Sequence, residues 1–194
     1  SICPHPCMDN CNRNYYEQAL SIRACKLAAA PEALALAAQL KAAKPVGRKA
    51  AVVGGGPAGL AAAGLLARRG WQVAVFEREA DFGGLVRRVI PAFRIADEMI
   101  DADLALLKSW GVELKPNHEV EDIGALLRNH DAVLLAIGAE QPGRLKLKSG
   151  QAMNALDFLA ACKSGNMLPP GKQIVVAGGG NSAVDAARAA LRLP

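Results

Sequence analysis

The sequence predicts an α/β fold with a doubly wound parallel sheet, preceded by a helical segment that contains cysteines. Two observations support this prediction. From residue 47 onward, apolar strand patterns alternate with helix patterns. In addition, two glycine-rich turns each stand between an apolar run and a helix pattern. We therefore expect a helical N-terminal segment over residues 1–46, a nucleotide-binding unit over 47–170, and the truncated start of a second unit over 171–194.

Each element is assigned from its periodicity and its flanking turn residues. The N-terminal part is expected to be helical over residues 12–44, with a second helix beginning at Pro31, because proline suits a first helical turn. Strands are expected in the segments KAAVV, WQVAVFE, VEL, DAVLLAIG (as a buried strand) and KQIVVAG. Helices are expected after both glycine turns and over residues 96–110, 123–129 and 154–163.

Composition limits the function classes. The net charge of +5 is mild, the basic pairs Arg68-Arg69 and Arg87-Arg88 form no tract, and no nucleic-acid-reading motif is present, so we expect no nucleic-acid partner. No stretch approaches the roughly 20 apolar residues of a membrane span, and no signal-peptide pattern is present. The five cysteines, three of them clustered, do not resemble a secreted disulfide framework. We therefore expect a reducing, cytoplasmic location, and the initial Ser1 suggests that residues are missing upstream.

The first glycine turn matches the dinucleotide fingerprint. Gly54, Gly56 and Gly59 form G-x-G-x-x-G between a strand and a helix. Gly54 permits the tight turn, and Gly56 allows the backbone to approach a pyrophosphate at the helix N-terminus. Glu77 ends the next strand about 20 residues later, where an acidic residue binds the adenosine ribose. A purely structural glycine turn is the alternative, and this context makes it the weaker interpretation.

Ribose recognition by Glu77 fits either NAD or FAD, and two later features favour FAD. The pair Gly83-Gly84 follows soon after the acidic residue, where it can pass close to a longer cofactor. Gly138 ends the strand LLAIG and provides a second close approach to the same edge of the sheet. Either feature alone is typical of an ordinary turn, but both together indicate FAD.

The second glycine turn, with Gly178, Gly180 and Ala183, has the permitted variant G-x-G-x-x-A. Two such turns suggest two nucleotides, a flavin and a nicotinamide that reduces it. The strand whose end would bind the second ribose is not included in the sequence, so NADP and NAD both remain open. We expect this polypeptide to be a piece of a longer one.

Several motifs together resemble a known family. CPHPCMDNC, GGGPAGL, FGGLVRRVIPAFR, LLAIG, NALDFL and VVAGGGNSAVDAAR follow one another in the family order. The chain resembles the small-chain, or beta-subunit, group of glutamate synthase, an arrangement that also occurs in the N-terminal part of dihydropyrimidine dehydrogenase. The resemblance implies an FAD- and iron–sulfur-dependent flavoprotein oxidoreductase. Such a protein takes hydride from NADPH, or occasionally NADH, and passes electrons to a larger catalytic subunit or domain.

The resemblance also implies site residues. For FAD they are Ile2, Gly54, Gly56, Pro57, Ala58, Gly59, Glu77, Gly84, Leu85, Arg94 and Val120. For the nicotinamide nucleotide they are Gly180, Asn181, Ser182 and Ala183, which extend the turn that begins at Gly178. We assign no catalytic acid or base, because the cofactor carries the reaction in flavin chemistry. The family's upstream cysteine group is missing, as is everything after the first helix of the nicotinamide domain. We therefore expect the fragment alone to be inactive.

Cys3, Cys7 and Cys11 recur every four residues and are the candidate metal ligands. Pro4 and Pro6 disfavour a regular helix across the first two, which favours a loop wrapped around a cluster. Three residues between successive cysteines count against zinc, and iron–sulfur clusters normally take four thiolates. In the family, ligands for two clusters are shared with the upstream group. The fourth ligand is therefore expected outside this chain, or the site is empty in it.

The remaining candidates have simpler interpretations. His5 is more often a turn residue than a ligand. Cys25 could supply an extra ligand, but its apparently amphipathic helix favours a packed thiol, and Cys162 is expected to be structural. One rival function remains open: a non-enzymatic nucleotide-binding module, stabilised by zinc, that organises a partner.

Overall fold

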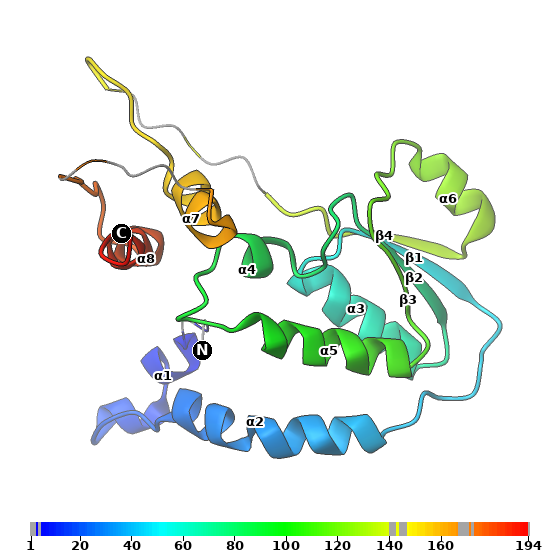
Figure 1. Ribbon diagram of the computed structural model, residues 1–194. Coiled ribbons are helices and arrows are strands. Elements are labelled where there is room, and N and C mark those ends of the chain that lie inside the picture. Colours follow the sequence, from blue (N-terminus) through cyan, green and yellow to red (C-terminus); the bar gives the residue numbers. More distant parts are fainter. Residues whose placement is uncertain are drawn as a thin grey trace. The chain divides into compact units, whose positions relative to one another are not determined.

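The computed structural model describes residues 3, 5–139, 143, 147–166, 171 and 173–193 (Figure 1). By its internal contacts the chain divides into two compact units, Ser1–Lys41 and Ala42–Pro194. Residues 42–46 go with the second unit, where Ala43 N–H donates to Arg68 O and Val46 N–H donates to Gly70 O. Among the described residues, the helices lack the length and apolar character needed to cross a membrane.

The first unit contains a short helix α1 (Pro6–Asp9), a 3₁₀ turn η1 (Asn12–Tyr15) and a long helix α2 (Ile22–Gln39). The prediction of two helices separated at Pro31 is wrong, because α2 continues through this proline. The surrounding run of alanines and leucines has a high helix propensity that offsets the one missing backbone hydrogen bond. Residues 17–21 and 40–44, which we expected to be helical, lie outside the helices.

Helix α2 has no buried residue, and Cys25 on it is exposed. The prediction that Cys25 is a packed thiol is therefore wrong for this structure. Apolar alanines occur around the whole circumference of α2 and do not form a single stripe, so the amphipathic interpretation of its sequence also fails.

The second unit is built on a parallel sheet, as predicted. Its strands are β1 (Lys49–Val53), β2 (Gln72–Phe76), β3 (Glu113–Lys115) and β4 (Ala132–Leu135), in the spatial order β3-β2-β1-β4. In the central register, Val52 pairs with Val75 on one side and with Leu134 on the other. Because all four strands are parallel, their carboxyl ends meet at one edge of the sheet, where the first glycine turn begins.

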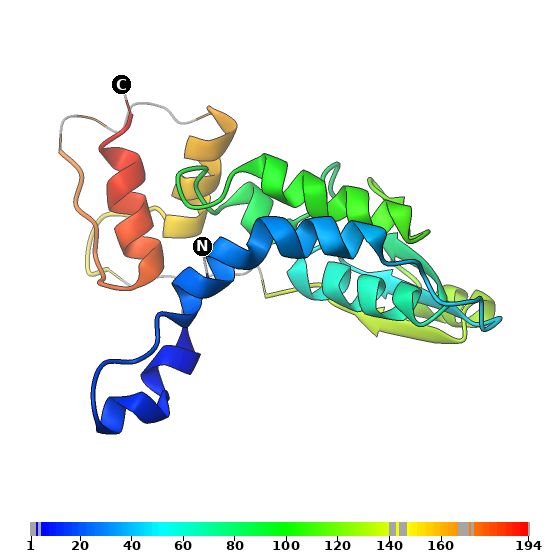
Figure 2. The ribbon, with the colours of Figure 1, turned by 90° about the horizontal axis from the view of Figure 1, so that it is seen from below.

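Helices cover both faces of this sheet (Figures 1 and 2). On one face, α3 (Pro57–Arg68) and α5 (Asp97–Ser109) pack over the fully buried Val52 and Val75. On the opposite face, α6 (Ile123–Asn129) provides Leu126, which packs against a cluster that includes Phe76. The helices predicted after the first glycine turn and over 96–110 and 123–129 are thus present.

Strand β4 is an edge strand, and it is not buried as we predicted. Leu135 is 52% exposed and Ile137, just beyond the strand, is 68% exposed. An apolar run predicts burial only if another element covers it. Among the described residues, α6 lies over the face that includes Val133 and leaves these two side chains open.

The short helix α4 (Gly84–Arg88) follows β2, and the C-terminal part of this unit adds α7 (Ala155–Ser164) and α8 (Asn181–Ala190). Helix α7 was predicted, and its N-cap Asn154 accepts a hydrogen bond from Leu156 N–H at 2.8 Å. Helices α7 and α8 lie side by side (Figure 2) and form a second apolar cluster with Val89.

Among the described residues, the strand predicted before the second glycine turn is not formed. Residues 173–179 have no regular structure, and Val175 is 94% exposed. A strand needs a neighbour for its backbone hydrogen bonds, and within the described residues no strand lies beside this segment. Sequence propensity alone therefore does not produce the strand.

Candidate functional site

The first glycine turn is held by backbone approaches that exclude side chains. Gly54 has φ +108°, and a Cβ atom on it would lie 2.3 Å from the carbonyl oxygen of Ala136. A Cβ atom on Gly59 would lie 2.0 Å from the carbonyl oxygen of Gly54. These two glycines are therefore required by the turn itself, which brings α3 close to β1 and to the end of β4.

Gly56 differs from its neighbours, because it has ordinary dihedral angles and open space beside it. It is the N-cap of α3 with φ −77° and ψ −179°, and no heavy atom lies within 4 Å of where its Cβ would be. Leu60 N–H donates to Gly56 O, so the N–H groups of Ala58 and Gly59 precede the first hydrogen bond of the helix. Pro57, which has no N–H, fits the first helical position. This end of α3 can therefore bind an anion that approaches the backbone of Gly56.

Glu77 lies at the carboxyl end of β2 and is only 8% exposed. Its Oε2 accepts a hydrogen bond from Gly55 N–H at 2.6 Å, and its Oε1 accepts one from Glu79 N–H at 3.0 Å. The two bonds fix the carboxylate beside the glycine turn. Because each carboxylate oxygen has two lone pairs, both can accept a further hydrogen bond from a ligand hydroxyl.

The pair Gly83-Gly84 closes over the same turn. Both residues have positive φ, +120° and +53°, and Gly83 N–H donates to Gly55 O at 2.8 Å. A Cβ atom on Gly84 would lie 3.0 Å from the Cα atom of Gly56. The sequence indicated that this pair approaches the cofactor, which stays a prediction; within the protein the pair lies directly against Gly56.

Sequence reasoning missed two residues of this site, Gly55 and Phe82. A Cβ atom on Gly55 would lie 2.5 Å from Cδ1 of Phe82 and 3.0 Å from Oε2 of Glu77. The fingerprint leaves the position of Gly55 unspecified, so it carried no signal. The buried Phe82 belongs to the cluster beneath α3 and α5, and its ring holds the loop after β2 against the glycine turn.

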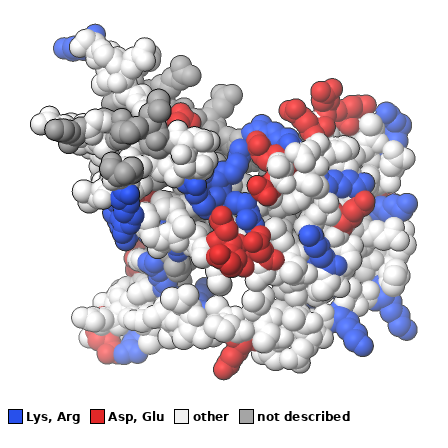
Figure 3. All heavy atoms as spheres, in the orientation of Figure 1, with Lys and Arg blue, Asp and Glu red and all other residues white. Residues whose placement is uncertain are grey.

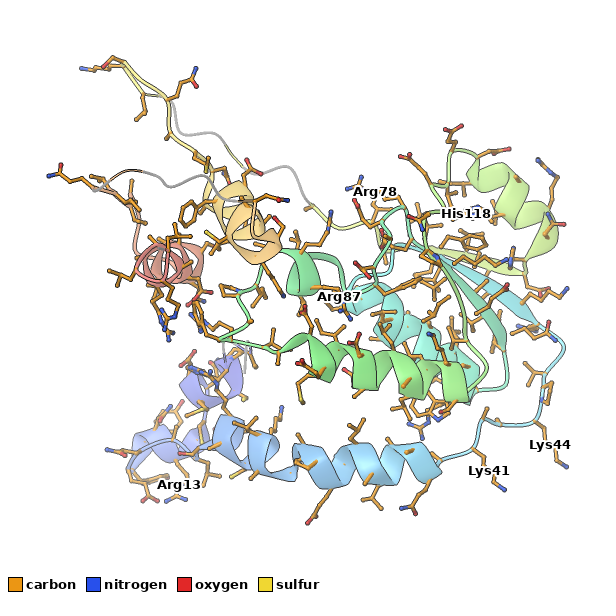
Figure 4. The ribbon with its side chains drawn as sticks, in the orientation of Figure 1. Arg13, Lys41, Lys44, Arg78, Arg87 and His118 are labelled. Carbon is orange, nitrogen blue, oxygen red and sulfur yellow. The ribbon has the colours of Figure 1, made fainter. Side chains whose placement is uncertain are left out.

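The segments that follow the carboxyl ends of β4 and β3 complete this region. Ala136 N–H donates to Val53 O at 2.7 Å, and Gly138 follows with φ +75°. Val120 is partly buried against the cluster that contains Phe76. His118 N–H donates to Glu77 O at 2.7 Å, and Figure 4 shows His118 and Arg78 at the same end of the sheet. The structure thus gathers the first turn, Glu77, Gly84, Val120 and Gly138 around one edge.

Leu85 and Arg94 are also predicted flavin residues, and both contact α7 or α8. Leu85 packs against the apolar cluster shared by these helices. Arg94 Nε donates to Oδ1 of Asp185 in α8 at 2.7 Å. Arg87 is directed toward α5 and forms an ion pair with Asp101 (Figure 4). The predicted residue Ile2 lies outside the described residues.

The second glycine turn repeats the backbone geometry of the first. Gly178 has φ +128°, like Gly54, and Gly180 is the N-cap of α8 with φ −77° and ψ 172°, like Gly56. Gly180 is likewise open, with no heavy atom near its Cβ position, and Asn181 and Ser182 begin the helix. A Cβ atom on Gly178 would lie 3.5 Å from the Cβ atom of Ala183. The turn keeps the shape of an anion-binding helix start although its strand is absent.

The candidate metal ligands are not gathered into a site. Among the described residues, no group of three His, Cys, Asp or Glu side chains could hold a metal ion. Cys3 and Cys7 are exposed. As predicted, a regular helix does not span the two, because α1 begins only at Pro6, which takes the tolerated first helical position; Cys7 itself lies in this short helix rather than in a loop. Hydrogen bonds from the backbone N–H groups of Leu20 and Arg13 hold the pKa of the Cys11 thiol below its usual value. These residues alone do not form a four-thiolate cluster site.

Charged side chains of both signs are interspersed on the face shown in Figure 3. No continuous basic surface is visible there among the described residues. The open Gly56 at the start of α3 lies at the carboxyl edge of the sheet, and the open Gly180 starts α8 away from it; each helix N-terminus is available to a phosphate group.

Comparison with known proteins agrees with this geometry. A family model described as an NAD(P)-binding Rossmann-like domain matches residues 52–110. The chain is 41% identical to the YgfK protein of Escherichia coli O157:H7 over 205 residues, which covers 100% of this chain and 19% of that protein. It is 36% identical to the glutamate synthase [NADPH] small chain of Mycobacterium tuberculosis, covering 95% of this chain and 42% of that one. The chain belongs to the family of the glutamate synthase small chain.

A further family member is the NADPH-Fe(3+) oxidoreductase subunit beta of Geobacter sulfurreducens, 35% identical over 98% of this chain and 30% of that protein. Among solved structures, the His57Gln mutant of FprA from Mycobacterium tuberculosis has a TM-score of 0.62 at 26% identity, covering 75% of this chain and 36% of that one. The chain therefore spans between 19% and 42% of the curated family members named here.

Proposed function

We propose that the chain is part of an FAD- and iron–sulfur-dependent NAD(P)H oxidoreductase subunit, which passes electrons from NAD(P)H through the flavin to a partner catalytic domain. The observation that carries this proposal is the open Gly56 at the start of α3, with Gly84 against its Cα atom and Glu77 hydrogen-bonded to the adjacent Gly55. The names of relatives as NADPH-dependent enzymes or subunits support the same class of reaction.

The pyrophosphate of FAD fits the first glycine turn. The N–H groups of Ala58 and Gly59 donate to phosphate oxygens, and the positive end of the α3 dipole favours their charge. The hydrogen of Gly56, in place of a side chain, allows this approach. Glu77 accepts hydrogen bonds from the ribose hydroxyls with the lone pairs that Gly55 and Glu79 leave unused.

Two features favour FAD over a nicotinamide nucleotide at this turn. Gly84 brings a second backbone segment against Gly56, and Gly138 leaves space beyond the end of β4, where the flavin half of a longer cofactor would extend. When bound, FAD accepts hydride and passes electrons on one at a time. The residues of this chain bind and orient the cofactor and provide no acid or base for that chemistry.

The second glycine turn is the proposed beginning of the NAD(P)H site. The N–H groups of Asn181 and Ser182, beside the open Gly180, would donate to the pyrophosphate of the nicotinamide nucleotide. Residues that would bind its ribose and hold its ring at the flavin are not part of this sequence. We therefore expect the chain to bind FAD but not to oxidise NAD(P)H.

Iron–sulfur ligation by Cys3, Cys7 and Cys11 is proposed as a shared function with cysteines outside this sequence. The backbone hydrogen bonds from Leu20 and Arg13 lower the pKa of the Cys11 thiol from its usual value, which suits a thiolate ligand. Anaerobic reconstitution with iron and sulfide should give little stable cluster on this chain and substantially more once upstream cysteines are restored. A robust four-iron cluster on the chain alone would contradict the shared site and would make the exposed Cys25 the first candidate for the fourth ligand.

A titration tests the flavin assignment. Purified chain should bind FAD with 1:1 stoichiometry, seen as a change in flavin fluorescence, and the loaded chain should stay oxidised when NADPH is added. A longer chain that completes the second nucleotide domain should be reduced by NADPH. A chain that binds zinc and no flavin would contradict the proposal and favour the rival interaction module.

A further inference from the structure

Helix α8, which follows the second glycine turn, contacts the segment that contains Phe93 and Arg94. Phe93 contacts two cations: the guanidinium groups of Arg188 in α8 and of Arg192, which follows the helix, lie 4.5 and 4.6 Å from its ring centroid. Next to it, Arg94 Nε donates to Asp185 Oδ1 at 2.7 Å. Two side chains of α8 and the nearby Arg192 therefore contact two consecutive residues of one short segment, which gives the helix a defined orientation.

The ion pair is well shielded from water. Asp185 is 8% exposed and the side chain of Arg94 is 24% exposed, so both charges have lost much of their hydration. A buried carboxylate without its cation would be strongly destabilised, which makes the pair a specific connection rather than a surface contact. Toward the described part of the chain Arg94 donates through Nε, so further N–H donors of its guanidinium can serve a second acceptor.

Continuous packing links this connection to the first glycine turn. Gly84 abuts Gly56, and α4 begins at Gly84. Leu85 of α4 and Val89 pack in one cluster with Ala186 and Ala189 of α8. A ligand that binds at the first turn and holds Gly84 in place therefore also favours the packing of α8 against Leu85 and Val89.

We propose that Asp185 is a positioning residue for the flavin site. Through its hydrogen bond with Arg94, it connects α8, the helix after the second glycine turn, to the segment that follows α4 beside the first glycine turn. The inference rests on the proposed binding of FAD at the first turn. It follows that FAD binding and the docking of α8 are coupled, and thermodynamic linkage requires this coupling to act in both directions. Asp185 contributes to flavin affinity although it lies in α8, the helix that follows the second glycine turn.

The experiment measures FAD affinity by fluorescence titration and hydrogen exchange in residues 181–190, with and without FAD. In the wild-type chain, FAD should slow exchange in α8. Asp185→Asn should weaken FAD binding about fivefold or more, the lower range of coupling between sites, and should remove the slowing. Asp157→Asn is the matched control, because Asp157 is an exposed aspartate on the neighbouring helix α7, and it should change neither quantity.

A conservative variant separates the charge from simple packing. Asp185→Glu keeps the carboxylate, so it should retain FAD affinity and α8 protection much better than Asp185→Asn, even if the latter loosens the helix completely. Equal losses in the two variants would overturn the role of the ion pair, and so would unchanged FAD affinity in Asp185→Asn beside normal binding by the wild-type chain. A wild-type chain that binds no FAD would instead refute the proposed function itself.

Discussion

The contrast between Gly56 and Gly59 gives the sharpest test of why the first turn is rich in glycine. In Gly59→Ala, the new methyl group would lie 2.0 Å from the carbonyl oxygen of Gly54, so β1 and α3 must move apart. Overpacking of this kind costs about 1–3 kcal/mol of folding free energy. For a chain of this size each kcal/mol lowers Tm by about 2–4 °C, so we expect a decrease of about 2–12 °C.

In Gly56→Ala, the same methyl group meets no protein atom within 4 Å, and the backbone angles suit alanine. Stability should therefore be unchanged, while the methyl group stands where the pyrophosphate approaches. If the resulting clash costs about 1–3 kcal/mol, as overpacking does in a core, the Kd for FAD rises about 5- to 150-fold. Calorimetric melting and fluorescence titration of both variants measure the two effects. Normal FAD affinity in a stable Gly56→Ala chain would refute the reasoning.

Three further predictions concern other parts of the second unit and Cys25. Glu77→Gln places an amide N–H₂ opposite one of the two backbone donors, so the free energy of unfolding should decrease by about 1–3 kcal/mol in denaturant titrations. FAD affinity should also decrease, and no change in either quantity would contradict the position of Glu77. Asn154→Ala should destabilise α7 by about 1 kcal/mol in the same assay, whereas Asn154→Asp retains the cap and serves as the control. Iodoacetamide at pH 8 should modify the exposed Cys25 faster than Cys162, because burial raises the pKa of the Cys162 thiol and reduces its thiolate fraction. Equal modification rates, measured by peptide mass spectrometry, would contradict this difference in reactivity.

Much of the sheet and its first turn could be predicted from the sequence, because local pattern and tertiary context agree there. The run around Val52 is apolar, β-branched and bounded by glycine, and its burial by neighbouring strands reinforces that preference. The contact of Gly83-Gly84 with the first turn was not predicted, since the pair was expected only to pass close to a longer cofactor.

The failures occur where a segment's partners decide its structure. Residues 173–179 have the same apolar pattern as β1, but no described strand pairs with them. Leu135 is apolar yet half exposed, because no described element covers it. The contacts of Arg94 with Asp185 join residues 91 positions apart, and no local pattern indicates such a pair. Gly55 was missed because the fingerprint does not specify its position.

The central claim is that the first glycine turn binds FAD, whereas the family model that matches residues 52–110 is described by NAD(P). Amide chemical-shift mapping of the ¹⁵N-labelled chain tests this directly. We predict that one equivalent of FAD shifts the amide signals of Gly56, Ala58 and Gly59, and that NADPH leaves these signals unchanged. Shifts of these three amides by NADPH but not by FAD would contradict the account.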